Sequence, residues 1–246
     1  MPASADTVRQ WQEGRALGEV SSYHLSQSHK QFPIMANSRR TTPKPWSLTQ
    51  SETALDCPYF VARVDQVRDG LGVPRVYYNV RMKNFGIAVV PIDSEGRTIL
   101  VGQQRYVLNG FTWEVIRGGG SLNRLPLESA KRELSEETGY SADNWLELLK
   151  GSASPGLTDE LTVGFVAWNL HSSRPHPDAG EELVQKRVPF AQAIDMVVSG
   201  EIADLASSAL LLAIKVRLER QELPDSLVSC LQRGRQSSEG DPTSGR

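Results

Sequence analysis

The stretch KRELSEETGY, Lys131–Tyr140, decides the fold because it is the charged half of one predicted helix. Pro126 suits the first turn of a helix, where its missing N–H is not needed. Gly139 suits the position just after the last turn, which favours a left-handed backbone. The spacing therefore predicts a helix over 126–138.

Three glutamates of this stretch lie on one side of the predicted helix. At about 3.6 residues per turn, the spacing i, i+3, i+4 forms a single stripe, which here contains Glu133, Glu136 and Glu137. The stripe lies directly beside the apolar stripe of Ala130 and Leu134, and not on the opposite, solvated face. Like charges at this spacing repel by roughly 0.2–0.5 kcal/mol, and the penalty grows at the edge of a core unless a cation neutralises them.

A divalent cation is the expected partner of these carboxylates. Mg²⁺ prefers carboxylate oxygens and keeps several waters for chemistry, and Mn²⁺ suits the same ligands. The glycine run 118–120 just before the helix would let a backbone or a ligand approach closely. Charge spacing alone also fits an ordinary acidic surface helix, so both interpretations stay open at this point.

Bulk composition sets only wide limits. The chain has 246 residues, with 27 Lys plus Arg against 29 Asp plus Glu and a net charge of −2, so its charge demands neither nucleic acid nor an anionic membrane. Two distant cysteines, Cys57 and Cys230, predict reduced intracellular thiols. No apolar run reaches the roughly 20 residues that span a bilayer, and the N-terminus has no apolar signal segment. We therefore expect a cytoplasmic protein.

Composition divides the chain into parts. A polar N-terminal region with no sustained period is expected to be disordered apart from a short helix over 8–17. Met35 is an alternative start site to Met1. The expected parts are a disordered segment 1–44, a domain 45–232 made of a β extension over 45–84 and a core over 85–217, and a disordered tail 233–246.

Short apolar runs separated by turn residues predict the remaining elements. The predicted strands are YFVARVDQV (59–67), RVYYNVRM (75–82), FGIAVVPID (85–93), TILVGQQRYV (98–107), FTWEVI (111–116), WLELLKGSAS (145–154) and LTVGFVAWNL (161–170). Amphipathic helices are predicted over 189–200 and 206–221. Hairpins with a few inserted helices indicate an α+β fold or a layered sandwich.

The helix and the glycines before it also resemble a known motif. From Gly118 the chain runs GGGSLNRLPLESAKRELSEETGY, which resembles the Nudix box: a glycine, five residues, a glutamate, seven residues, then Arg-Glu-apolar-x-Glu-Glu-x-Gly-apolar. The positions that match in register are Gly118, Arg132, Glu133, Leu134, Glu136, Glu137, Gly139 and Tyr140. The resemblance implies the Nudix fold, an α/β/α sandwich of mixed and antiparallel strands, here with an N-terminal antiparallel β extension.

One position departs from the box. Arg124 stands where the first glutamate of the motif should fall, and Leu125 stands where a Ser or Thr cap would be usual before proline. In the family that first glutamate mainly supports the loop and the box arginine, while the later glutamates hold metal. The departure therefore bears on loop stability and rate more than on the metal site.

The flanking segments, over residues 45–217, resemble the ADP-ribose pyrophosphatases and related nucleoside diphosphate sugar hydrolases. PWSLTQSETALDCPYFVARVDQV (45–67) is similar to the N-terminal strands of that branch, which build a homodimer in relatives. VGQQRYVLNGFTWEVIRGGG (101–120) is similar to its Q-x-R…W-E-x-P-x-G segment. Pro155 lies 16 residues beyond Gly139, the spacing associated with ADP-ribose in this branch.

The resemblance implies Mg²⁺-dependent hydrolysis of ADP-ribose to AMP and ribose 5-phosphate, with Mn²⁺ as a possible substitute. It implies a general base in the loop after the box, for which Glu160 is the first candidate and Asp159 the second; a polar turn is the alternative interpretation. Glu136 and Arg132 would join Glu160 in catalysis, with Arg132 orienting the glutamates. The implied metal ligands are Glu133, Glu136, Glu137 and the carbonyl of Arg117.

Four residues are candidates for contacts with the substrate. Arg105 suits phosphate oxygens, and a surface salt bridge is its alternative role. Glu114 suits a metal ion or a sugar hydroxyl, and a pair with Arg105 or Arg117 is its alternative role. Gly118 allows close approach, and Tyr78 is a candidate to stack on adenine, with its neighbour Tyr77 as the other choice.

Two other functions remain open at the level of sequence. The first is hydrolysis of another nucleotide sugar, such as GDP-mannose. The second is a non-catalytic Nudix domain that senses ligands similar to ADP-ribose, which the Arg124 departure favours. The intact box glutamates favour an enzyme over a sensor.

Overall fold

The computed structural model describes residues 44–172 and 183–239, with side chains described up to residue 234. The short helix expected over 8–17 lies outside the described residues. Within the described ranges, no helix is both long and apolar enough to cross a lipid bilayer.

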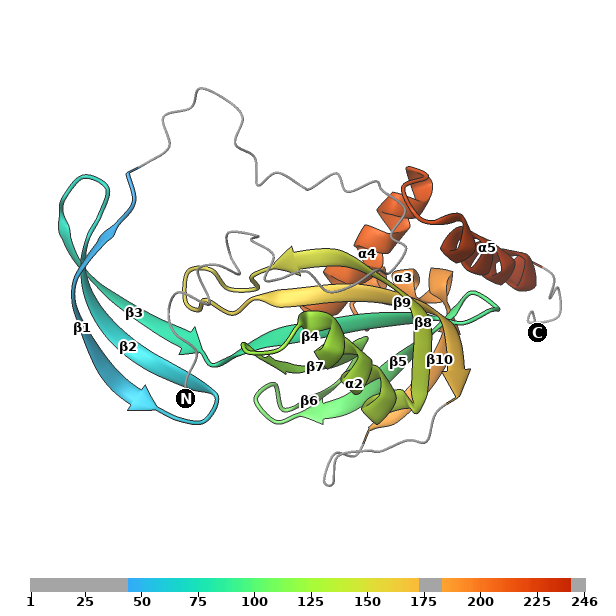
Figure 1. The fold of residues 1–246 in the computed structure, drawn as a ribbon, viewed down its shortest axis with the longest axis horizontal. Helices are drawn as coiled ribbons and strands as arrows, with labels where there is room; N and C mark the ends of the chain where they lie inside the picture. Colours follow the sequence, from blue (N-terminus) through green and yellow to red (C-terminus); the bar gives the residue numbers. More distant parts are fainter. Residues whose placement is uncertain (1–43, 173–182, 240–246) are drawn as a thin grey trace.

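A seven-stranded mixed sheet forms the centre of the body (Figure 1). Its five main strands lie in the order β10 (Val184–Pro189), β5 (Arg97–Arg105), β4 (Asn84–Ile92), β9 (Thr162–Ser172) and β8 (Tyr140–Gly151). Two shorter strands join it, β6 (Gly110–Glu114) against β5 and β7 (Ile116–Ser121) against β4. Only β4 and β9 run parallel among these pairs, which confirms a sheet of mixed and antiparallel strands.

Helices cover both faces of this sheet, because strand β4 is apolar on both sides. Ile87 and Val89 belong to one fully buried cluster with Leu134 of α2 (Pro126–Thr138). Ala88 and Val90 alternate with them and belong to a second cluster on the opposite face. That cluster includes side chains of α3 (Phe190–Ser199), α4 (Leu205–Glu219) and α5 (Asp225–Glu239). The predicted α/β/α sandwich is confirmed.

A separate three-stranded antiparallel sheet precedes the body and protrudes from it (Figure 1). It consists of β1 (Ser47–Asp56), β2 (Phe60–Arg68) and β3 (Pro74–Met82), and it confirms the predicted β extension. The loop over 152–161 fastens to β3, because the Val80 N–H donates to the Leu157 carbonyl at 2.9 Å. This contact brings the loop after β8 to the junction between extension and body.

The C-terminal end differs from the sequence prediction. The tail expected to be loose from residue 233 continues helix α5 to Glu239. Gly234 resembles a helix stop in the sequence, but its missing side chain allows close approach to the tight turn at Gly96. A Cβ on Gly96 would lie 2.6 Å from the Cys230 carbonyl, so the turn and the helix pack backbone to backbone. The helix therefore packs on the body through this part of the chain.

Candidate active site

Helix α2 begins and ends where the sequence predicts. Leu125 occupies the N-cap and makes no side-chain capping hydrogen bond, so Pro126 starts the helix without the usual Ser or Thr. Gly139 ends it with φ 71°, a left-handed backbone that glycine adopts without strain. The helix packs on β7 and β4 through Ala130 and Leu134, both fully buried. The glutamate stripe therefore lies at the edge of the core, as predicted.

Glu133 is seated against the glycine strand. Glu133 is only 7% exposed, and a carboxylate is rarely buried to this degree without a strong partner. A Cβ placed on Gly118 of β7 would overlap the Glu133 carboxylate, so any larger residue there would displace this side chain from its present position. The first glycine of the predicted motif therefore packs directly against the first of the three glutamates.

Arg132 connects the glutamates to that strand. Its Nη2 donates to Glu133 Oε1 at 2.5 Å and to the Gly119 carbonyl at 2.9 Å, while Nη1 donates to Glu136 Oε2 at 2.5 Å. One guanidinium therefore orients two carboxylates and fixes helix α2 against β7. This geometry agrees with the orienting role that the resemblance implied.

Burial raises the pKa of the Glu133 carboxyl to about 7, and nearby Glu136 adds to the rise, whereas Arg132 and a backbone hydrogen bond from Gly119 oppose it. The carboxylate form is thus costly in this position even beside an arginine. A divalent cation with hard oxygen ligands would lower that cost. The carboxylates of Glu133 and Glu136, which Arg132 holds side by side, are donors of the kind that such an ion prefers.

The glutamates do not form a ready-made cage. In the ranges 44–172 and 183–239, no three His, Cys, Asp or Glu side chains are gathered closely enough to hold a metal ion together. Glu137 lies one residue beyond Glu136, and its backbone carbonyl accepts from Gln185 Nε2 at 2.6 Å. This arrangement suits an ion such as Mg²⁺, which takes one or two carboxylates and keeps water on its other positions.

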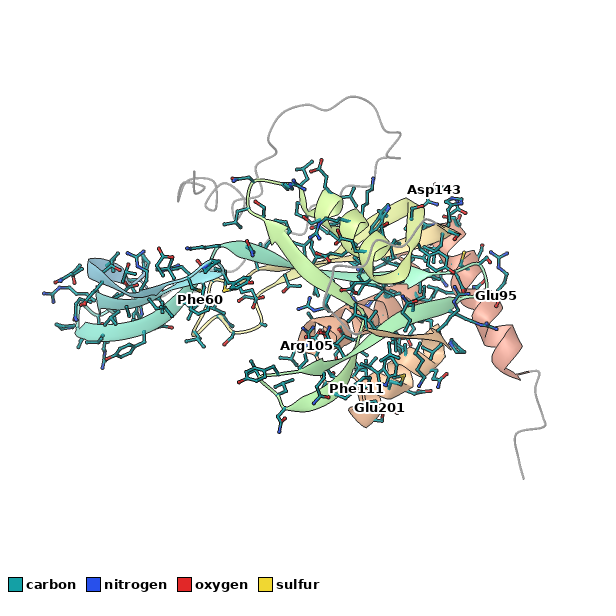
Figure 2. The ribbon with its side chains drawn as sticks, turned by 90° about the horizontal axis from the view of Figure 1, so that it is seen from below. Phe60, Glu95, Arg105, Phe111, Asp143 and Glu201 are labelled. Carbon is teal, nitrogen blue, oxygen red and sulfur yellow. The ribbon has the colours of Figure 1, made fainter. Side chains whose placement is uncertain are left out.

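Arg105 lies in the part of the body nearer the β extension (Figure 2) and forms a closed pair with Glu114. Arg105 Nε and Nη2 donate to the two carboxylate oxygens of Glu114 at 2.8 and 2.5 Å. The hydrogen bonds to Glu114 raise the pKa of Arg105 against the opposing effect of burial, and the charges of Asp204 and Glu137 contribute. Glu137 and Asp204 therefore both lie within electrostatic reach of this arginine.

The loop over 152–161 distinguishes the two candidate bases. Asp159 is fastened in place, since it accepts from the Met82 N–H at 2.8 Å and pairs with Arg81 at 3.4 Å. The Glu160 carboxylate has no hydrogen bond or ion pair to the described residues. A Cβ built on Gly86 would lie 3.5 Å from Oε1 of Glu160. Gly86 belongs to β4, the strand that pairs with β7.

A hollow of about 620 Å³ lies between this loop and the β extension, a volume that suits a small-molecule ligand. Tyr77 lines it, held by a 2.7 Å hydrogen bond from its hydroxyl to the Gly156 carbonyl, and Trp46 packs edge-on against Tyr77. Tyr78 is not among the residues that line it and is 69% exposed. Of the two adjacent tyrosines, Tyr77 faces the hollow.

Sequence reasoning missed Asp204 and the buried Asp65. Asp204 caps helix α4 and pairs with Arg117, although the sequence signal for it was only a capping residue before an apolar run. Asp65 is 5% exposed, lines the hollow and accepts from Asn79 Nδ2 at 2.6 Å. No local pattern distinguishes Asp65 from the other polar residues of an alternating strand.

The raised pKa of Glu133 predicts a pH-dependent stability in the metal-free protein. The neutral carboxyl stabilises the fold fully below pH 4.5, the ordinary pKa of a glutamate, and this stability is lost as the pH rises to about 7. Glu133→Gln removes the titrating group, so wild type should lose roughly 1–3 kcal/mol more than the variant between pH 5 and pH 8. Urea denaturation with chelator present measures both curves, and parallel pH dependences would contradict the burial argument.

Comparisons with known proteins agree with this fold and site. A family model described as NUDIX domain matches residues 82–204. The ADP-ribose pyrophosphatase of Mycobacterium tuberculosis (strain ATCC 25618 / H37Rv) is 32% identical over 169 residues, which cover 67% of this chain and 80% of that protein. ADP compounds hydrolase NudE of Escherichia coli (strain K12) is 29% identical over 187 residues, covering 74% and 97%. A crystal structure of an ADP compounds hydrolase matches with a TM-score of 0.64 at 22% identity, over 75% of this chain and 100% of that one, which supports the fold alone.

A layered α/β/α fold with a carboxylate helix seated on a glycine strand defines a hydrolase that acts with a divalent metal ion. The chain belongs to the Nudix family. The family and the fold predicted from the motif at Gly118–Tyr140 are confirmed.

Proposed function

We propose that the protein hydrolyses the pyrophosphate bond of ADP-ribose and releases AMP and ribose 5-phosphate. The observation that carries this proposal is the seating of Glu133 on Gly118, with Arg132 linking Glu133 and Glu136. The relative named ADP-ribose pyrophosphatase, which aligns over two thirds of this chain, supports the choice of substrate.

In this proposal Glu133, Glu136 and Glu137 hold Mg²⁺, or Mn²⁺ in its place, together with the carbonyl of Arg117. When bound, the ion neutralises charge on the phosphates and lowers the pKa of a coordinated water. The residues of the chain do the remaining work. Arg132 holds two of the carboxylates in a fixed direction, so less reorganisation is needed when substrate binds.

Glu160 is the proposed general base, because its carboxylate is uncommitted while that of Asp159 is fixed to β3. Arg105 is the proposed phosphate contact, since its planar fork matches phosphate oxygens as well as it matches Glu114. Binding of a phosphate by Arg105 would therefore exchange one bidentate partner for another and release Glu114 for a metal or sugar contact.

The two loop acids are expected to behave differently on substitution. Glu160→Gln should lower kcat by about 10²- to 10⁴-fold with little change in KM, because general-base catalysis contributes on that scale. Asp159→Asn keeps an oxygen for the Met82 N–H and should retain most of the activity. Steady-state kinetics of both variants decides the assignment, and a larger loss in Asp159→Asn would reverse it.

A substrate panel tests the proposed function directly. The purified protein is incubated with Mg²⁺ and ADP-ribose, ADP-glucose, GDP-mannose or diadenosine polyphosphates, and the nucleoside monophosphate released is measured. We expect ADP-ribose to have the highest kcat/KM. Preference for GDP-mannose would replace the proposed substrate, and binding of ADP-ribose without turnover of any compound would show a sensor.

We also propose a homodimer formed through the β extension. The three-stranded sheet protrudes from the body and exposes apolar side chains at Leu48, Leu55, Val76 and Tyr78, and exposed apolar patches of this kind mark protein–protein contacts. Light scattering is expected to give twice the chain mass of 27.2 kDa, and Val76→Asp should shift it towards the monomer. A monomer for the wild-type protein at micromolar concentration would contradict the proposal.

A further inference from the structure

The N-terminus of helix α4 is tied to the strand that underlies the carboxylate helix. Oδ2 of Asp204 accepts from the Ser207 N–H at 2.8 Å and from the Ser207 hydroxyl at 2.6 Å, which caps the helix. The same oxygen lies 3.3 Å from Nε of Arg117 on β7. Capping needs only the contacts to Ser207, so Asp204 carries an additional ion pair to the strand.

Arg117 joins three elements at one point. Its backbone belongs to β7, its Nη1 donates to the Ile87 carbonyl of β4 at 2.9 Å, and its Nε pairs with Asp204 of α4. The side chains of Arg117 and Asp204 are only 18% and 24% exposed, so water screens this pair less than a surface pair. A parallel link runs from the Val115 N–H to Ser207 Oγ at 3.1 Å. Residues 115–117 are thus fastened to the start of α4.

The next two residues of β7, Gly118 and Gly119, contact Glu133 and Arg132 of the carboxylate helix. Gly118 leaves the space that the Glu133 carboxylate fills, and the Gly119 carbonyl accepts from Arg132 at 2.9 Å. The backbone of Gly119 also hydrogen bonds to Glu133. Gly118 and Gly119 directly follow Arg117 in β7, so the contacts that hold Arg117 lie next to the backbone that meets Glu133 and Arg132.

We propose that Asp204 is a positioning residue for the carboxylate site, acting through Arg117 on the backbone of 117–119. Among the described residues, Asp204 makes no hydrogen bond or ion pair with the box glutamates; its side chain contacts Ser207 and Arg117. The inference rests on the proposed function only in that Glu133 and its neighbours bind a metal ion. The proposal predicts that the affinity of the glutamates for a metal ion depends on Asp204, which caps α4 on the face of the sheet opposite to α2.

The test is a titration with Mn²⁺ alone, in which free ion is followed by electron paramagnetic resonance without substrate. Asp204→Asn keeps an oxygen to cap α4 but removes the charge that faces Arg117, and it should raise the Kd for Mn²⁺ about tenfold. Arg117→Gln should give a similar rise, and the double variant should be no weaker than either single one, because both changes break the same link. Asp225→Asn, in the first turn of α5, is the matched control and should leave the Kd unchanged.

An unchanged Mn²⁺ Kd in folded Asp204→Asn overturns the proposal, and so does an additive loss in the double variant. If Asp204→Asn does not fold, Arg117→Lys is compared with Arg117→Gln; the lysine variant should keep more affinity, and equal losses overturn the role of the ion pair. Glu133→Gln separates this proposal from the proposed function. Equal Mn²⁺ binding by wild type and Glu133→Gln contradicts the metal site itself, whereas a normal Glu133→Gln effect with no Asp204→Asn effect contradicts the positioning role alone.

Discussion

Replacing Glu137 with glutamine is expected to lower kcat/KM for ADP-ribose by about 10²- to 10³-fold, the range that follows loss of one group that stabilises transition-state charge. The substitution keeps the size of the side chain and the backbone carbonyl that accepts from Gln185. It removes one negative charge from the stripe that is proposed to hold the ion. The melting temperature should therefore stay close to that of wild type, while the Mg²⁺ concentration needed for half-maximal rate rises.

Glu128→Gln is the matched control for this prediction. Glu128 lies in the first turn of the same helix and is exposed, so its substitution makes the same change of charge away from the proposed site. It should leave kcat/KM within about twofold, since surface substitutions rarely exceed ±0.5 kcal/mol. Undiminished turnover by Glu137→Gln, or an equal loss in both variants, would show that the stripe does not hold the catalytic ion.

Gly118→Ala is expected to damage both the fold and the activity. The added Cβ would overlap the Glu133 carboxylate, so this buried side chain must move or the strand must shift. Overpacking of this kind costs about 1–3 kcal/mol. Misplacement of a catalytic group by about 1 Å costs on the order of 10²-fold in rate. Both losses should appear in one variant, measured by urea denaturation and by kcat/KM.

The next glycine provides the control. A Cβ on Gly119 would meet no atom within 4 Å, and its φ is not positive, so Gly119→Ala should be nearly neutral for stability. A comparison of the two alanine variants separates a specific clash from the general effect of glycine substitution in a strand. Equal stability of Gly118→Ala and Gly119→Ala would contradict the seating of Glu133.

Much of the fold followed from local patterns. Strand β4 is apolar on both sides because helices cover both faces of the sheet, and its sequence FGIAVVPI shows this directly. Helix α2 was predictable to the residue because Pro126 and Gly139 mark its ends by their own backbone preferences. Helix α5 was not, because the polar, glycine-containing end of the chain carries no local helix signal, while the structure continues the helix through Gly234, which packs against Gly96.

In the candidate site, too, some contacts follow from local sequence and others depend on tertiary packing. The roles of neighbours in one helix, such as Arg132 with Glu133 and Glu136, depend on a helical repeat that the sequence displays. The sequence ranked Glu160 before Asp159 by resemblance alone, because both occur in one polar turn. What the sequence did not show is that Asp159 is held by β3, which lies far away in the chain.

The sequence by itself determined the family and the layered fold through the resemblance of its motif at Gly118–Tyr140. It also determined a stripe of three glutamates at the edge of a core, because periodicity and capping act between residues a few positions apart. Only the tertiary structure decided that Arg105 closes on Glu114 and that Asp204 holds Arg117. These pairs join side chains on different strands and helices. Their partners are set by how the elements pack, since no local spacing in the sequence fixes which arginine meets which carboxylate.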